Sequence, residues 1–149
     1  PDHITSVNNK RFIEAHTRPT PNIQQGLELV RAGITTAMDI SDGLLNDLTK
    51  MCDSSEVGAD IYIDSIPTDK HLREKYPEKW DEIAIGGGED YELLFTANHD
   101  SINRLKDISE SEFFSIGKIT KKSSGIKILD TNGEIKTYTK FGWDHFKGK

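Results

Sequence analysis

Two short segments of the chain combine carboxylates with glycines, which are residue types that can bind metal ions and phosphates. In the segment 38–44, Asp39 and Asp42 could supply hard oxygen ligands for Mg²⁺, Ser41 adds a hydroxyl, and Gly43 permits close approach. Apolar residues predict a strand before this segment and a helix after it, and the amide groups of a helix N-terminus suit a phosphate. Taken alone, an ordinary helix cap with an acidic first turn is the commoner explanation.

The second segment, 86–95, begins with three glycines and continues with Glu89, Asp90 and Glu92. Glycines allow the backbone to approach a ligand closely. Three carboxylates within four residues repel one another, so the cluster is unfavourable unless a cation or a hydrogen-bond donor lies nearby. A flexible turn with solvated charges explains the same residues, and both interpretations stay open.

The third segment, 142–146, is Gly-Trp-Asp-His-Phe. Trp143 could stack on a heteroaromatic or cationic ring of a ligand. A tryptophan packed into the core is the alternative, and it is the commoner one. The segment therefore offers Trp143 as a candidate ligand contact, but its sequence does not decide between stacking on a ligand and packing in the core.

Periodicity and capping residues predict the elements that must position these segments. We expect helices at 6–16, at 22–32 with Asn22 as its cap, at 44–52 with Ser41 or Asp42 as its cap, at 68–76 and at 99–108. We expect strands at 34–40, 57–63, 91–95 and 113–119, and a terminal hairpin of 125–129 with 134–138. Residues Ile23, Leu27 and Val30 share one helical face. This mixture of helices and strands predicts the α+β class.

Composition limits the possible functions. The 149 residues suit one domain, and a net charge of -6 argues against non-specific nucleic-acid binding, which needs a basic face. No apolar run approaches the length of a membrane span. The single cysteine, Cys52, excludes an intramolecular disulfide and suggests a reducing compartment. The first residue is Pro1 rather than methionine, so we expect a piece of a longer chain.

The order and spacing of several motifs together resemble the C-terminal domain of the thiamine-monophosphate kinase family, a branch of the aminoimidazole ribonucleotide synthetase superfamily. The resemblance covers about residues 18–146. The segments that carry it are 39–44, 59–61, 66–67, 87–95, 117–119 and 142–146. It implies a three-layer α/β/α domain in the region 18–149, preceded by a lead-in at 1–17 from an N-terminal domain that is not in this sequence.

The resemblance also implies roles for particular residues. Asp39 and Asp42 match Mg²⁺-binding aspartates of the family motif, and Ser41 matches a position that contacts ATP. Glu89 and Trp143 match positions that contact the thiamine substrate. No catalytic side chain is assigned, because phosphoryl transfer depends mainly on alignment and on neutralisation of charge.

The expected activity is the ATP-dependent phosphorylation of thiamine monophosphate to thiamine diphosphate in the cytoplasm, with Mg²⁺ as cofactor. The resemblance implies a homodimer formed through the N-terminal domain, and we expect this chain alone to lack useful turnover. We expect neither a nucleic-acid nor a membrane partner. Two alternatives remain: a sister ATP-using enzyme that acts on a purine precursor, and a non-catalytic module that binds a ligand.

Overall fold

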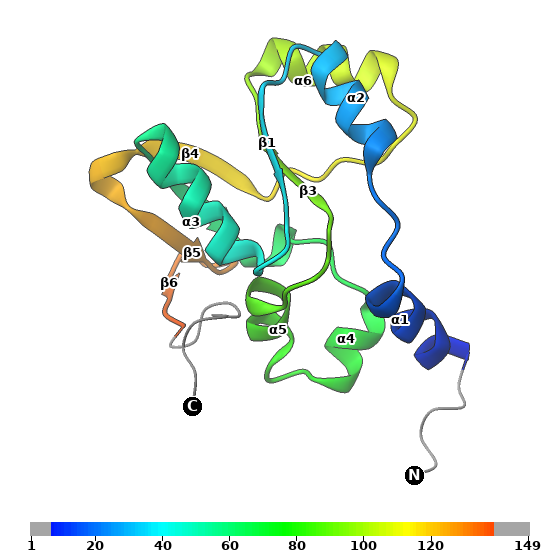
Figure 1. Ribbon diagram of the computed structural model, residues 1–149. Coiled ribbons are helices and arrows are strands. Elements are labelled where there is room, and N and C mark those ends of the chain that lie inside the picture. Colours follow the sequence, from blue (N-terminus) through cyan, green and yellow to red (C-terminus); the bar gives the residue numbers. More distant parts are fainter. Residues whose placement is uncertain (1–6, 139–149) are drawn as a thin grey trace.

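The computed structural model describes residues 7–138 and combines helices with two small β-sheets (Figure 1). The helices are α1 (Val7–Thr17), α2 (Ile23–Arg31), α3 (Leu44–Ser55), α4 (Lys70–Lys75), α5 (Trp80–Gly86) and α6 (His99–Ile108). The strands are β1 (Thr36–Asp39), β2 (Val57–Tyr62), β3 (Leu93–Thr96), β4 (Gly117–Lys121), β5 (Ile126–Leu129) and β6 (Ile135–Lys136). The short turns η1 (Ile63–Ser65) and η2 (Lys122–Ser124) follow β2 and β4. The predicted α+β class is confirmed.

The first sheet pairs β1 with β3 in antiparallel register, and α2 and α6 lie side by side at one end of it (Figure 1). A small core joins these two helices. Arg104 of α6 donates a hydrogen bond from Nε to the carbonyl of Ala32 at 3.0 Å, which closes the C-terminal end of α2. The buried members of this core are Leu29, Ala32, Ile34 and Leu105.

The second sheet has the strand order β4-β2-β5-β6, and α3 packs against it (Figure 1). Strand β2 is antiparallel to β4 and parallel to β5. The terminal hairpin is confirmed: β5 pairs antiparallel with β6, and Gly133 has φ of 79° in its turn. The apolar side of α3 contributes Leu44, Leu45, Leu48, Met51 and Cys52 to the larger core. Packing of α3 in this core places its beginning next to the end of β1.

Helix α5 was not predicted from the sequence. It is seven residues long and carries Asp81, which is 8% exposed. Lys136 and Tyr138 donate hydrogen bonds to the Asp81 carboxylate, so partners from the other end of the chain stabilise a buried charge. Burial alone raises the pKa of Asp81, but the bonds from Lys136, the Glu82 amide and Tyr138 hold it below its usual value.

Two other sequence predictions differ from the structure. The strand expected at 113–119 begins only at Gly117 and continues to Lys121. The predicted face of α2 exists, but Ile23, Leu27 and Val30 are exposed, at 70%, 49% and 70%. The same helix instead buries Leu29 and Glu28. Helical periodicity groups residues on one face, and tertiary packing decides which face is covered.

Candidate functional site

The first two candidate segments, which combine carboxylates with glycines, lie side by side although they are far apart in the sequence. The backbone N–H of Glu89 donates to the carbonyl of Ser41 at 2.9 Å, and that of Tyr91 donates to Ile40 at 2.8 Å. The backbone N–H of Ile40 donates in turn to the backbone carbonyl of Glu92 at 2.9 Å. These bonds continue the β1–β3 pairing beyond the strands. The loop after β1 and the loop before β3 therefore form one unit, which we call the paired loops (residues 40–43 and 86–92).

Close contact between the paired loops requires glycine. A Cβ atom on Gly88 would lie 2.8 Å from the carbonyl oxygen of Ser41, closer than real Cβ contacts come. Gly43 has φ of 103°, and a Cβ there would lie 3.0 Å from the carbonyl oxygen of Gly86. Glu89 also has a positive φ, of 66°, which is unfavourable for a residue with a side chain. Such backbone strain is concentrated at functional sites in proteins.

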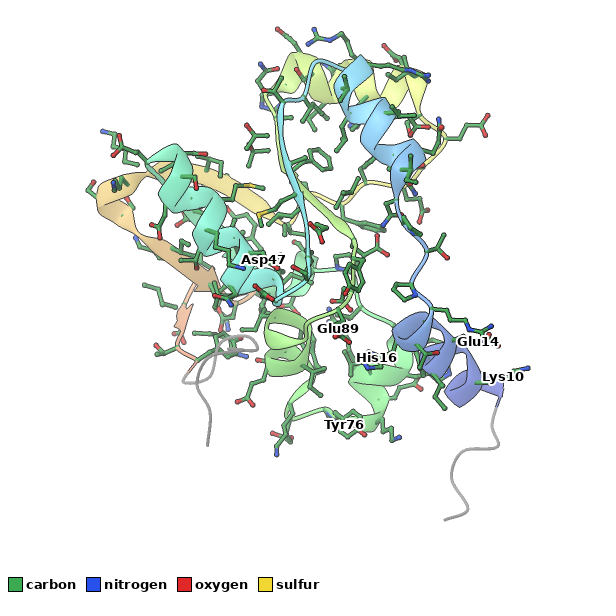
Figure 2. All side chains as sticks on the ribbon, in the orientation of Figure 1. Lys10, Glu14, His16, Asp47, Tyr76 and Glu89 are labelled. Atoms are coloured by element: carbon green, nitrogen blue, oxygen red, sulfur yellow. The ribbon has the colours of Figure 1, made fainter. Side chains whose placement is uncertain are left out.

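Asp47, from the first turn of α3, organises the loop that follows β1. Its side chain is 0% exposed, and its Oδ2 accepts hydrogen bonds from the backbone N–H groups of Ser41 and Asp42, both at 2.9 Å. Figure 2 shows Asp47 at the beginning of α3, beside the end of β1. The expectation that Ser41 or Asp42 caps α3 was wrong, because the cap position is Gly43 and no side chain caps it. The helix side chain holds the loop instead.

Lys50 bridges two carboxylates on this side of α3. Its Nζ donates to Asp42 Oδ2 and, at 2.7 Å, to Asp47 Oδ1. The pKa of Lys50 is raised, first by the hydrogen bond to Asp42 and then by the one to Asp47. An ammonium group thus already neutralises part of the negative charge around Asp42.

Two further predicted residues, Asp39 and Glu89, lie at or within the paired loops. Asp39 is the last residue of β1, is exposed, and is opposite Leu93 in the sheet. The Glu89 carboxylate is also exposed and lies 3.6 Å from Nε2 of His16, at the end of α1 (Figure 2). Trp143 lies outside the described residues. The structure thus brings Asp39, Asp42 and Glu89 to neighbouring backbone segments.

The carboxylates of the second loop differ in their surroundings. Asp90 is an exposed residue, but nearby protein atoms displace part of the water around its carboxyl group and raise its pKa, and repulsion by Glu92 raises it further. Asn22 donates from Nδ2 to the carbonyl of Tyr91 at 3.0 Å and to the Glu92 carboxylate at 3.1 Å. Asn22 therefore fixes this loop rather than capping α2 with its side chain.

The residues fit a magnesium ion that takes part of its coordination shell from a ligand. Across residues 7–138, no group of three or more His, Cys, Asp or Glu side chains is arranged to hold a metal ion by itself. Mg²⁺ is commonly bound through one or two carboxylates together with water and substrate phosphates. Asp39 and Asp42 can supply such carboxylates, and Asp42 already pairs with one cation, the ammonium of Lys50.

Sequence reasoning missed three residues of the site: Asp47, Lys50 and His16. The spacing of Asp47 and Lys50 on one face of a predicted helix was a usable signal, since residues three apart are neighbours there. The contact between His16 and Glu89 had no local signal. It arises only because α1 is folded back toward the second loop.

Comparison with known proteins places these features in a family. The family described as "AIR synthase related protein, C-terminal domain" matches residues 7–130. Thiamine-monophosphate kinase of Buchnera aphidicola (subsp. Acyrthosiphon pisum, strain APS) is 34% identical over 148 residues, which are 96% of this chain and 45% of that protein. The Escherichia coli (strain K12) kinase is 36% identical over 139 residues, 91% of this chain and 42% of that protein. The chain thus spans less than half the length of these relatives.

Solved structures agree with the sequence relatives. "AaThiL complexed with AMPPCP and TMP" superposes with a TM-score of 0.78 at 29% identity, covering 98% of this chain and 44% of that chain. Thiamine-monophosphate kinase from Stenotrophomonas maltophilia K279a gives a TM-score of 0.74 at 34% identity, covering 89% of this chain and 42% of that chain. The predicted resemblance and fold type are confirmed, and the chain belongs to the family of AIR synthase related proteins, as their C-terminal domain.

Proposed function

We propose that this chain is the C-terminal part of an enzyme that uses ATP to phosphorylate thiamine monophosphate. The observation that supports it best is the pairing of the two acidic, glycine-rich loops in a fold shared with a protein complexed with AMPPCP and TMP. AMPPCP is an analogue of ATP, and we take TMP to be thiamine monophosphate because another solved ThiL structure is named thiamine monophosphate kinase. In this proposal a phosphate oxygen of thiamine monophosphate attacks the γ-phosphorus of ATP. The bond from that phosphorus to ADP breaks, which gives thiamine diphosphate.

The residues of the paired loops have distinct roles in this proposal. Asp39 and Asp42 would hold Mg²⁺, which when bound neutralises phosphate charge and aligns the two substrates. Ser41 would contact ATP, at a loop whose backbone is fixed by Asp47. Glu89 would complement the cationic thiamine, and Trp143 would add an aromatic face. The exposed Glu89 carboxylate supports this role because a ligand can reach it.

We further propose that the remaining part of a longer polypeptide covers the exposed face of α2. This face carries Ile23, Leu27 and Val30 and adjoins a hollow of about 370 Å³ whose lining includes Ala37 and Met38. Exposed apolar patches commonly mark interfaces. In this proposal the remaining part of the polypeptide also completes the ATP site and forms the contact of a homodimer. The enzyme would work in the cytoplasm. None of the helices in the described region could span a membrane.

The test is an assay of this chain, alone and within the full-length polypeptide that contains it. Each protein is incubated with Mg-ATP and thiamine monophosphate, and thiamine diphosphate is measured as its fluorescent thiochrome derivative. We expect product from the full-length protein, none from the chain alone, and a large loss of rate in Asp42→Asn. A folded full-length protein that gives no product, or that turns over a purine ribonucleotide precursor instead, would contradict the proposal. Ligand binding without turnover would indicate a binding module.

A further inference from the structure

The cation at Asp42 in this structure is the side chain of Lys50. Its Nζ contacts Asp42 Oδ2 and also Oδ1 of Asp47, at 2.7 Å. The three side chains differ in solvent exposure: Asp47 is fully buried, Asp42 is 28% exposed and Lys50 is 48% exposed. Asp47 is therefore the most enclosed member of the bridge, and the lysine is the member with the most room to change position.

Asp47 cannot easily leave this arrangement, because its other oxygen accepts the backbone N–H groups of Ser41 and Asp42. The same carboxylate thus fixes the loop backbone and keeps the ammonium of Lys50 against the Asp42 side chain. A divalent cation bound at the Asp42 carboxylate would repel an ammonium group on the same oxygen. The two cations would therefore compete for the Asp42 carboxylate.

We propose that Lys50 is a positioning residue that acts as an internal counter-ion for Asp42 and is displaced when a divalent cation binds there. Before binding, the lysine neutralises Asp42 and holds its side chain in place. On binding, its ammonium leaves Asp42 and keeps its contact with Asp47. Lys50 therefore lowers the affinity of the site for the cation. This inference rests on the cation-binding role of Asp42 in the proposed function.

The first experiment measures Mn²⁺ binding to this chain without nucleotide, by the loss of the free Mn²⁺ signal in electron paramagnetic resonance. Manganese replaces magnesium because carboxylate sites bind both. Lys50→Met should bind Mn²⁺ about two- to fivefold more tightly than the unaltered chain, the range expected for loss of a partly exposed ion pair. Lys106→Met, an exposed lysine on α6, is the matched control and should not change the affinity. Equal or weaker binding by Lys50→Met would overturn the inference. If neither protein binds Mn²⁺ without nucleotide, the comparison is repeated with AMPPCP present, and the same outcome decides.

A second experiment needs no substitution, so a folding defect cannot obscure it. The unaltered chain is acetylated briefly with and without Mg²⁺, and each lysine is quantified by mass spectrometry. Displacement from Asp42 should raise the modification of Lys50 several-fold in the presence of Mg²⁺ and leave Lys106 unchanged. Unchanged or reduced modification of Lys50 would overturn the inference.

The two experiments also separate this inference from the proposed function. If Asp42→Asn abolishes Mn²⁺ binding but Lys50→Met does not strengthen it, the counter-ion role is wrong and the role of Asp42 stands. If Lys50→Met strengthens binding and the full-length protein makes no thiamine diphosphate, the counter-ion role stands and the kinase proposal fails.

Discussion

Replacement of Asp47 by alanine tests whether this buried carboxylate supports the candidate site. The substitution removes the acceptor of two backbone hydrogen bonds, from Ser41 and Asp42, and one partner of Lys50. Hydrogen bonds to a charged group contribute about 1.5–3 kcal/mol each. The desolvation cost of the buried carboxylate disappears as well, and Lys50 can turn toward water because it is half-exposed. We expect a net loss of about 2–4 kcal/mol in the free energy of unfolding.

The loss is measurable by urea unfolding, and the chain should remain folded, since domains of this size are stable by about 5–15 kcal/mol. Native-state hydrogen exchange adds a local readout: the amides of Ser41 and Asp42 should exchange faster, beyond the global change. Asp53→Ala, at an exposed position of the same helix, is the matched control and should change the free energy of unfolding by less than about 0.5 kcal/mol. A loss below about 0.5 kcal/mol for Asp47→Ala, or unchanged exchange at the two amides, would refute the reasoning.

Three further predictions concern the loops and the contacts that hold them. Gly88→Ala should lower the free energy of unfolding by about 1–3 kcal/mol, because its Cβ would press on the carbonyl oxygen of Ser41 in the opposite loop. Gly26→Ala is the control: its Cβ would lie 3.9 Å from Leu93 Cδ1, so urea unfolding should show unchanged or higher stability. Tyr138→Phe should cost about 1–2 kcal/mol by the same assay, since Asp81 loses a donor, and equal stability of the two proteins would contradict this. Asp90→Asn should be as stable as the unaltered chain at low pH and more stable as the pH rises through the raised pKa of Asp90, because only the ionised carboxylate is disfavoured in the fold. The check is urea unfolding at several pH values. A difference in stability that does not change with pH would be evidence against this.

Local sequence determined much of the site. The aspartates and glycine of 39–43 at a strand-to-helix junction, the three glycines before Glu89, and the Asn-Gly turn of the hairpin all carry short-range signals. These signals depend on backbone geometry within a few residues, which is why they can be recognised without a structure. The order of the motifs was also sufficient to predict the family, and the mixture of expected helices and strands to predict the α+β class.

Tertiary structure decided what the local patterns could not. The sequence did not show that the paired loops touch, that Asp47 rather than Ser41 or Asp42 holds the loop, or that Lys50 neutralises Asp42. It also did not predict α5, whose buried Asp81 depends on partners from residues 136–138. Each of these features needs a contact between side chains or backbone groups that only the packing of distant elements brings together. Local propensity is short-ranged, whereas burial and the pairing of charges depend on the whole fold.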